Sequence, residues 1–351
     1  MDSYKIAVDD NILLKDSVST AGSKILYNFV PPFNSDVADK LAAAGINDII
    51  RTKPNEFGVS LTGGFGCVDS VAEGGADIGI GCDINGSIRG EASKKGVCFI
   101  KPTYGTVSRF GLVSTAASME QIGVACRDIE TGFKALSLIA GLGPPPAADH
   151  LKDMKIGFPT ECKELMAGTA RRLSGLGAKV GAFDPPHIEQ AAVAAYIISA
   201  AETSNSISRF DGIKFGYRTE NYSNLEDIYV KSRTECFTFE TKLFTLIGML
   251  VLTKEKYGDY FDKSQKVRRL IKDGYDLVFN DYDAIMTPVE YTEAGSGDEY
   301  REFCSSYKNL GYLALPNLTG RPALAIPGVQ FIVNPFGEDT LYRLGAACYG
   351  I

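Results

Sequence analysis

The sequence predicts an α/β protein with a mostly buried sheet. Apolar residues switch repeatedly between the two-residue period of strands and the 3.6-residue period of helices. Of the 351 residues, 45% are hydrophobic and 23% are charged, an ordinary globular composition with enough apolar side chains for a large core. No internal repeat or low-complexity tract is visible. Fibrous and disordered classes are therefore excluded.

The first 141 residues contain clear start and stop signals for their elements. Asn34 and Ser35 are residue types that cap the N-terminus of a helix, and Gly45 is typical of a helix end. Gly141 likewise follows an apolar pattern with helical spacing. The signals predict, in order, a strand at 5–8, a helix between Ser35 and Gly45, a strand at 46–50 and a helix at 129–140.

The rest of the chain reads as a helical region followed by strands. Three consecutive prolines, 144–146, require an extended surface connection, after which the strand pattern resumes at 155–158. Beyond Pro186 the apolar spacing becomes helical. The predicted elements are helices at 188–204, 235–254 and 258–279 and strands at 283–286, 323–326 and 329–333.

Composition also restricts the function. A formal net charge of −7 does not provide a broad basic surface for binding phosphates, so we expect any nucleic acid to be held by a partner. The longest apolar stretches, such as Leu243 to Leu252, are shorter than the roughly 20 residues that span a bilayer. The first ten residues lack the apolar segment of a signal peptide. We therefore expect a cytoplasmic protein.

The cysteines and histidines do not form a recognisable site. The eight cysteines occur singly, without a C-x-x-C pair, so we expect reduced core residues, no metal site and no cofactor in this chain. The two histidines, His150 and His187, do not lie beside a candidate nucleophile in the sequence. A Ser-His-Asp mechanism is not favoured.

Glycines are concentrated between residues 63 and 105, and Ser87 lies among them. Glycine allows backbone amides to approach a ligand closely, and such amides can stabilise an oxyanion next to a serine nucleophile. Ser87 is therefore the candidate nucleophile. On residue types alone, tight turns and close packing of buried strands explain these glycines equally well. Neither of the common glycine-rich phosphate-binding patterns is present.

The order of motifs in this glycine-rich region resembles the amidase signature family. Residues 81–89 read GCDINGSIR and residues 100–105 read IKPTYG, similar to the family's GSDTGGSIR and GLKPTYG at matching spacing. Within the family, the chain is most similar to the A subunits of tRNA-dependent amidotransferases, and this resemblance covers nearly the whole chain. The segments that carry it are 17–28, 108–112, 204–215 and 264–271.

The resemblance has consequences for fold and organisation. It implies one large mixed β-sheet covered by helices on both faces, in a single domain over residues 1–351. The glycine- and serine-rich catalytic core is expected at 59–127, and a helical region typical of the subfamily at about 186–280. Compared with the family, the chain is shortened, because it starts directly at the catalytic strand and lacks a segment between Phe57 and Gly63.

The family hydrolyses amides with a Ser-cisSer-Lys triad, in which a neutral lysine accepts a proton through a bridging serine while the second serine attacks the carbonyl. The resemblance places Ser87 at the nucleophile. It places the oxyanion-binding amides in the loop formed by Ile84, Asn85 and Gly86, with Asn85 where glycine is usual. Since Asn tolerates left-handed backbone angles, we expect this loop to be retained.

Two triad positions and one binding position depart from the family. Asp9 stands where the lysine is expected, and Gly63 stands where the bridging serine is expected. In the glutamine site, Arg268 matches the arginine that binds the substrate carboxylate. Leu310 replaces the aspartate that binds the ammonium, which leaves that charge without a partner. Lys5 and Lys101 are the lysines considered as substitutes for the lost base.

The charged residues that follow the nucleophile give a further expectation. Glu91, Lys94 and Lys95 stand where the family has apolar residues packed near the nucleophile loop. Because burying an unpaired lysine is costly, we expect this helix start to be more exposed than in the family. Arg89 matches the family, and we expect it to brace the loop through hydrogen bonds.

Three functions remain open at this point. The first is a glutaminase subunit that supplies ammonia for transamidation of mischarged Glu-tRNA(Gln), severely impaired or inactive here. The second is a catalytically inactive homologue that only binds partners or ligands, and the third is a stand-alone amidase with Asp9 as a rewired base. The resemblance implies glutamine as the small-molecule substrate and the amidotransferase B and C subunits as partners. It implies tRNA contact through a partner, which would also hold ATP and Mg²⁺.

Overall fold

The computed structural model describes residues 4–60, 63–144, 151–289 and 299–349. Its strands are β1 (Ile6–Asp9), β2 (Ile49–Thr52), β3 (Ile78–Asp83), β4 (Cys98–Lys101), β5 (Gln121–Cys126), β6 (Lys155–Pro159), β7 (Lys179–Phe183), β8 (Ala284–Pro288), β9 (Ala323–Ile326) and β10 (Val329–Val333). Its α-helices are α1 (Asp36–Ala43), α2 (Gly66–Ala72), α3 (Ser87–Lys94), α4 (Ile129–Ala140), α5 (Lys163–Gly175), α6 (Ile188–Ile207), α7 (Leu225–Cys236), α8 (Phe239–Val251), α9 (Lys263–Asp281), α10 (Glu299–Thr319) and α11 (Glu338–Tyr349).

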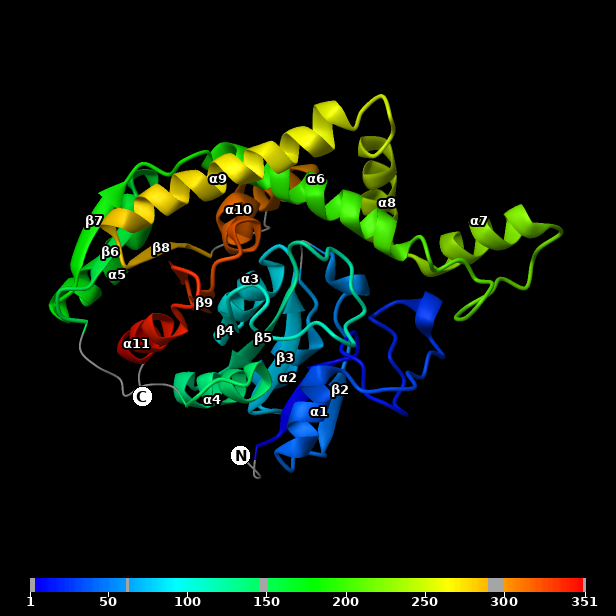
Figure 1. The fold of residues 1–351 in the computed structure, drawn as a ribbon, viewed down its shortest axis with the longest axis horizontal. Helices are drawn as coiled ribbons and strands as arrows, with labels where there is room; N and C mark the ends of the chain where they lie inside the picture. The colour runs from blue at the N-terminus through cyan, green and yellow to red at the C-terminus, as the bar shows by residue number, and fades with distance from the viewer. Residues whose placement is uncertain (1–3, 61–62, 145–150, 290–298, 350–351) are drawn as a thin grey trace.

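These strands form one mixed sheet, which confirms the predicted fold class (Figure 1). The described residues place ten strands in the order β2-β1-β3-β5-β4-β9-β10-β8-β6-β7. Strand β1 runs parallel to β2 and β3, and β6 runs parallel to β7 and β8. The other pairs are antiparallel, including β4 with β9 in the middle of the sheet.

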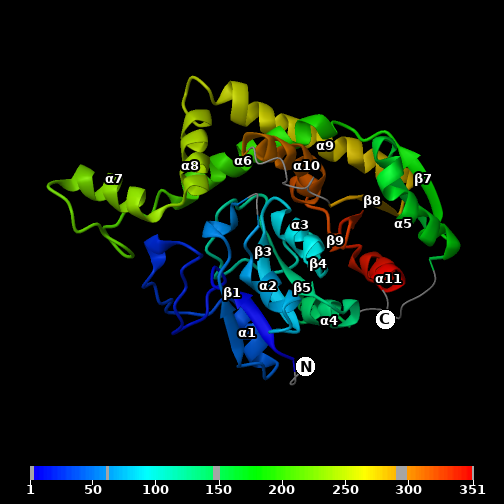
Figure 2. The ribbon, with the colours of Figure 1, turned by 180° about the vertical axis from the view of Figure 1, so that it is seen from behind.

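Both faces of the sheet are covered by helices, because both faces of the strands carry apolar side chains. On one face α1, α4, α5 and α11 pack against residues such as Ile6, Ile80 and Phe331. On the other face α2 and α3 pack against Ala7 and Phe99, and the bundle of α6, α9 and α10 packs against Ile332. Figures 1 and 2 show α6, α9 and α10 on the side of the molecule away from α1 and α4.

The face that receives α2 and α3 is lined by very small residues. A Cβ atom built on Gly79 would lie 2.5 Å from the carbonyl oxygen of Cys67, and one built on Gly81 would lie 2.6 Å from the Cys67 Sγ. Both glycines belong to β3, and Cys67 belongs to α2. At these two positions the glycines therefore allow a helix to pack closely on a strand. Close packing was the explanation of the glycines that did not require a catalytic role.

The predicted elements agree with the structure where local capping is strong. The Ser35 side chain accepts a hydrogen bond from the Ala38 amide at the start of α1, and Gly141 ends α4 with φ of +71°. The strand predicted at 46–50 is displaced and occurs at Ile49–Thr52, because the Ile46 amide donates to the Leu41 carbonyl and closes the end of α1. The predicted connection at 144–146 extends into residues outside the described ranges.

The helix predicted at about 235–254 is present as α8 but is shorter at both ends. It begins only at Phe239, since Phe237 is extended and the Thr238 side chain accepts a hydrogen bond from the Thr241 amide, and the preceding α7 was not predicted. The helix predicted at 258–279 is a π-helical turn, Gly258–Asp262, that continues into α9. No helix among the described residues is long and apolar enough to cross a membrane.

Helices α6 and α8 are in close contact, and this contact generates a stability prediction. A Cβ on Gly248 of α8 would overlap the Ala200 carbonyl oxygen of α6 and lie 2.5 Å from the Ser204 Cβ. We expect Gly248→Ala to lower the free energy of unfolding by about 1–3 kcal/mol, because the helices must separate. The measurement is urea unfolding followed by circular dichroism.

Gly168 of α5 is the matched control, because a Cβ there meets no atom within 4 Å. Gly168→Ala should raise the free energy of unfolding by about 0.5–1 kcal/mol through helix propensity alone. Changes of the same sign in the two variants would contradict the described packing of α6 on α8.

Candidate active site

Ser87 is the first residue of α3 and lies directly after the turn that follows β3. Gly86 makes this turn with φ of +91°, and a Cβ at this position would overlap the Leu313 carbonyl group of α10. Only glycine fits both restrictions. The strand, turn and helix thus fix Ser87 at a helix N-terminus, with only 2% of its surface exposed.

The loop before Ser87 satisfies its own amides. The Gly86 amide donates to Asp83 Oδ1 at 2.7 Å, and the Ser87 amide donates to Asn85 Oδ1 at 3.2 Å. Asn85 keeps a negative φ, so its side chain, rather than a left-handed backbone, adapts it to this position. The Ile84 side chain packs in a core cluster with Phe57 and Phe210. Two of the amides expected to bind an oxyanion therefore already have partners.

Arg89, which we expected to brace the loop, is completely buried. It connects its own helix α3 with β3, α10 and β10. Its Nε donates to Asp83 Oδ2 at 2.6 Å, and its terminal nitrogens donate to the Leu313 carbonyl at 2.5 Å and to Asn317 Oδ1 at 2.6 Å. A further hydrogen bond reaches Gln330 Oε1 in β10. This confirms the expected bracing role. Asp83, its ion-pair partner, was not identified from the sequence.

Asp9, which the resemblance places at the family's lysine, is fully buried at the end of β1. Its Oδ1 accepts hydrogen bonds from Thr52 Oγ1 and from the Cys67 amide, both at 2.9 Å. Its Oδ2 has no hydrogen-bond partner and borders Gly81, where a built Cβ would lie 3.0 Å away. Burial away from water raises the pKa of Asp9 to about 6, although the Cys67 and Thr52 hydrogen bonds act in the opposite direction.

Gly63, which the resemblance places at the bridging serine, faces a carboxylate from α3. Its φ is +103°, and a Cβ built on it would overlap Glu91 Oε2 and lie 2.9 Å from Glu91 Cδ. The Glu91 side chain is only 13% exposed and pairs with Lys95 at 3.2 Å. The space that a side chain at position 63 would use is therefore filled by Glu91.

The expected exposure of this helix start is only partly correct. Lys94 and Lys95 are exposed, as predicted. The first residues of α3, Ser87 to Gly90, are buried, because Arg89 ties the helix to α10 and β10. The contact of Glu91 with Gly63 was missed by the sequence analysis. Its spacing of four residues from Ser87, together with a missing side chain at position 63, is the signal in the sequence.

The two lysines considered as substitutes differ in environment. Lys5 is exposed just before β1. Lys101 at the end of β4 is 1% exposed, and its Nζ donates to the Pro102 carbonyl at 3.0 Å. Burial lowers the pKa of Lys101 to about 7, partly offset by the charge of Asp83. Lys101 thus has the chemistry of a possible base, but its one hydrogen bond is to backbone.

Arg268 is held by backbone and by one serine. Its Nε donates to the Leu318 carbonyl at 2.7 Å, and its terminal nitrogens donate to the Ser118 carbonyl and hydroxyl at 2.8 Å. It lines an open pocket of about 320 Å³. The other residues that line this pocket are Tyr104, Gln265, Arg269, Lys272, Leu318, Thr319 and Gly320.

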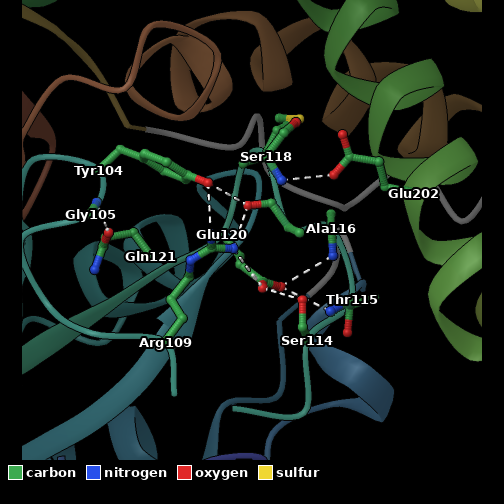
Figure 3. A network of polar contacts seen from close by, with 12 residues as sticks. Tyr104, Gly105, Arg109, Ser114, Thr115, Ala116, Ser118, Glu120, Gln121 and Glu202 are labelled. Atoms are coloured by element: carbon green, nitrogen blue, oxygen red, sulfur yellow. Dashed lines mark hydrogen bonds and ion pairs between the residues drawn. The ribbon is translucent and has the colours of Figure 1, made fainter. Parts of the chain in front are cut away.

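The loop that holds Arg268 is itself fixed by the carboxylates of Glu120 and Glu202, as Figure 3 shows. Glu120 is 1% exposed and accepts hydrogen bonds from the amides of Thr115 and Ala116 and from Ser114 Oγ and Arg109. The Ser118 amide donates to Glu202 of α6 at 2.8 Å. These contacts immobilise Ser118 and hence the guanidinium of Arg268.

Leu310, which the resemblance places at the family's aspartate, lies in α10 and is 2% exposed. It packs in the core cluster of α6, α9 and α10, with Ile271 and Ala192. An apolar residue suits this environment, since a carboxylate here would need a partner to offset its burial. The structure therefore brings Gly63 and Glu91 together, while Leu310 belongs to the helical core.

The Arg89 cluster predicts a large loss of stability on substitution. We expect Arg89→Met to lower the free energy of unfolding by about 3–5 kcal/mol, because Asp83 would remain buried without its ion-pair partner. Urea unfolding of wild type and variant provides the measurement. Arg269→Met is the control, since Arg269 is exposed and pairs only with Asp273, one turn away on α9. A similar midpoint for both variants would contradict the role assigned to Arg89.

Asp9 predicts a specific pH dependence of stability. Because its pKa is raised from the usual 3.8 to about 6, the folded state binds the proton more tightly than the unfolded chain does. Its contribution to stability is complete below pH 3.8 and is lost as the pH rises through 6, on the order of 3 kcal/mol in total. Asp9→Asn should therefore raise the free energy of unfolding relative to wild type at pH 7 and much less at pH 4.

Urea unfolding at the two pH values measures this difference, with the exposed Asp48→Asn as control. An equal effect of Asp9→Asn at both pH values would show that the Asp9 carboxyl does not titrate in this range.

Comparisons with known proteins agree with this fold. A family model described as Amidase matches residues 62–332. The A subunits of glutamyl-tRNA(Gln) amidotransferase from Lactiplantibacillus plantarum and from Enterococcus faecalis are each 35% identical over 397 aligned positions, which cover 97% of this chain and 81% of theirs. The crystal structure of the Thermotoga maritima A subunit has a TM-score of 0.73 at 26% identity and covers 98% of this chain and 82% of that one. The chain is therefore a member of the amidase family.

Proposed function

We propose that this chain is an A-subunit-like protein of a tRNA-dependent amidotransferase in which hydrolysis of the glutamine amide is severely impaired. The resemblance to A subunits extends over nearly the whole chain and supports the first part. One observation carries the second part. At the position of the catalytic lysine lies the Asp9 carboxylate, buried and with one oxygen already accepting two hydrogen bonds.

Loss of the triad has a physical consequence for rate. Asp9 accepts protons only weakly compared with a neutral lysine, and Gly63 has no hydroxyl to pass a proton from Ser87. Members of such a triad act as a unit, so removing them costs orders of magnitude in rate and leaves what the oxyanion loop and substrate binding provide. Here the oxyanion loop has bonded two of its own amides to Asp83 and Asn85, which reduces that remainder further.

The substrate would be held unequally at its two ends. Arg268 is proposed to bind the glutamine carboxylate, with its guanidinium preoriented by Ser118 and Leu318. Leu310 offers no charge to the ammonium, which costs several kcal/mol for a charge left unpaired in a desolvated site. We further propose that the B and C subunits of the amidotransferase are the partners, in the cytoplasm, and that tRNA, ATP and Mg²⁺ are held by them.

A binding-only role is the second candidate, and the bonded amides of Gly86 and Ser87 favour it. A loop whose donors are already paired is stable without substrate. Such a protein would keep its partner contacts and release no ammonia.

Ammonia release from glutamine tests the proposal. We expect the wild-type chain, alone and with the B and C subunits, to release ammonia at least about 1,000-fold more slowly than a restored variant. Restoration requires Asp9→Lys and Gly63→Ser together with Glu91→Ala, because a side chain at position 63 overlaps the Glu91 carboxylate. Ser87→Ala in the restored background is the control for the nucleophile.

Two outcomes would overturn the proposal. Fast Ser87-dependent release by the wild type would establish an efficient glutaminase. Failure of the wild type to bind the B and C subunits, measured by ultracentrifugation, would contradict its place in the amidotransferase. Wild-type release equal to that of Ser87→Ala, with partner binding retained, would select the binding-only role.

A further inference from the structure

Glu91 combines three features that no other carboxylate near Ser87 shares among the described residues. It lies four positions after Ser87 on α3, so both side chains emerge on the same face of the helix, about 5–6 Å apart at Cβ. Helical side chains point toward the N-terminus of their helix, which directs Glu91 toward the turn that carries Ser87. Its carboxylate also contacts Gly63.

The contact with Gly63 locates the carboxylate at a chemically important place. In the triad arrangement, the side chain at position 63 bridges the nucleophile and the base. Here position 63 has no side chain, and Glu91 Oε2 occupies the space where that side chain would begin. A carboxylate oxygen from α3 has thus replaced a hydroxyl from the preceding loop.

The Glu91 carboxylate is also held in this orientation. Lys95, one turn further along α3, pairs with Oε1 at 3.2 Å, so that Oε2 is the oxygen at Gly63. Lys95 in turn pairs with Asp69 of α2, and hydrogen bonding to Asp69 raises the pKa of Lys95. A chain of charges, Asp69, Lys95 and Glu91, therefore connects α2 to the side of Ser87.

We propose that Glu91 is the proton acceptor for Ser87 in the residual amide hydrolysis of this chain. This inference rests on the proposed function. Ser87 Oγ forms a bond to the carbonyl carbon while its proton passes to Glu91 Oε2. Collapse of the tetrahedral intermediate breaks the C–N bond, and the protonated Glu91 returns the proton to the departing ammonia. Water then attacks the acyl-enzyme, with its proton passing through Glu91 to Ser87.

Asp9 is the competing acceptor, and its contacts argue against it. Its Oδ1 already accepts hydrogen bonds from Thr52 and the Cys67 amide, and its Oδ2 borders Gly81 and the Cys67 thiol between β3 and α2. Glu91 instead shares a helix face with Ser87. The missing side chain at position 63 and the carboxylate at position 91 are thus complementary, since the Glu91 carboxylate lies where a side chain at position 63 would begin.

The experiment compares the full-length wild type with single variants under conditions where each retains its circular dichroism spectrum. Two rates are measured, namely ammonia release from glutamine and covalent labelling of Ser87 by an aryl fluorophosphonate, with Ser87→Ala as the baseline. We expect Glu91→Gln to lower both Ser87-dependent rates about 100-fold or more, while Glu91→Asp restores part of the loss. Glu130→Gln is the matched control, since Glu130 forms the same four-residue pair with Lys134 on α4.

Three results would overturn the inference. The first is a Glu91→Gln variant as fast as wild type. The second is a loss of labelling in Asp9→Asn with Glu91→Gln unaffected, which would assign the proton to Asp9. The third is a wild type labelled no faster than Ser87→Ala, which removes the inference but leaves the proposed impaired function intact. In the opposite case, the wild type would release ammonia fast and this release would depend on Glu91. That result would support Glu91 as the proton acceptor and would overturn the proposed impairment of hydrolysis.

Discussion

The buried ion pair between Arg89 and Asp83 is the interaction on which the rest of the site depends. A guanidinium without solvent is expensive unless its donors are paired, and Arg89 has partners in the nucleophile loop, α10 and β10. Asp83 pairs with Arg89 through one oxygen and with the Gly86 amide through the other. The turn that contains Ser87 is therefore held by the Asp83–Arg89 ion pair and its hydrogen bonds, independently of the residues that would perform catalysis.

The residues that hold the nucleophile turn are therefore separate from those in which the proposed loss of catalysis lies. The contacts that position Ser87 involve Asp83, Arg89 and Gly86, whereas the departures that the resemblance implies are at Asp9 and Gly63. The departures are also accommodated individually. Asp9 gained hydrogen bonds from Thr52 and the Cys67 amide, and the space at Gly63 is filled by Glu91.

Local signals in the sequence predicted the elements whose ends are determined locally. Ser35 and Gly141 cap their helices as their residue types indicate. Strand β3 was not predicted, because Gly79 and Gly81 interrupt the apolar alternation that marks a strand. Helix α7 was not predicted, and the predicted start of the next helix at 235 lies four residues before α8, whose N-cap is Thr238.

In the candidate site, too, the features determined by adjacent residues were predicted and those determined by tertiary contacts were not. The position of Ser87 followed from a motif of adjacent residues, and so did the bracing role of Arg89. The contact of Glu91 with Gly63 joins residues 28 positions apart and depends on how α3 packs beside the preceding loop. The burial of Leu310 depends on three helices that meet only in the folded chain. Such relations are set by tertiary packing, which residue types and spacing do not encode.

The order of strands divides the sheet into two halves that are each continuous in the chain. Residues 6–126 supply the five strands from β2 to β4, and residues 155–333 supply the five from β9 to β7. The halves meet at one seam, where Phe99 pairs with Ala325, and Arg89 crosses the same seam to reach Asn317 and Gln330. Contacts so distant in sequence close long loops of chain, and such contacts cost loop-closure entropy and are slow to form in folding. The sheet is thus assembled from two continuous fragments, and the Arg89 contacts that hold the nucleophile turn require both of them.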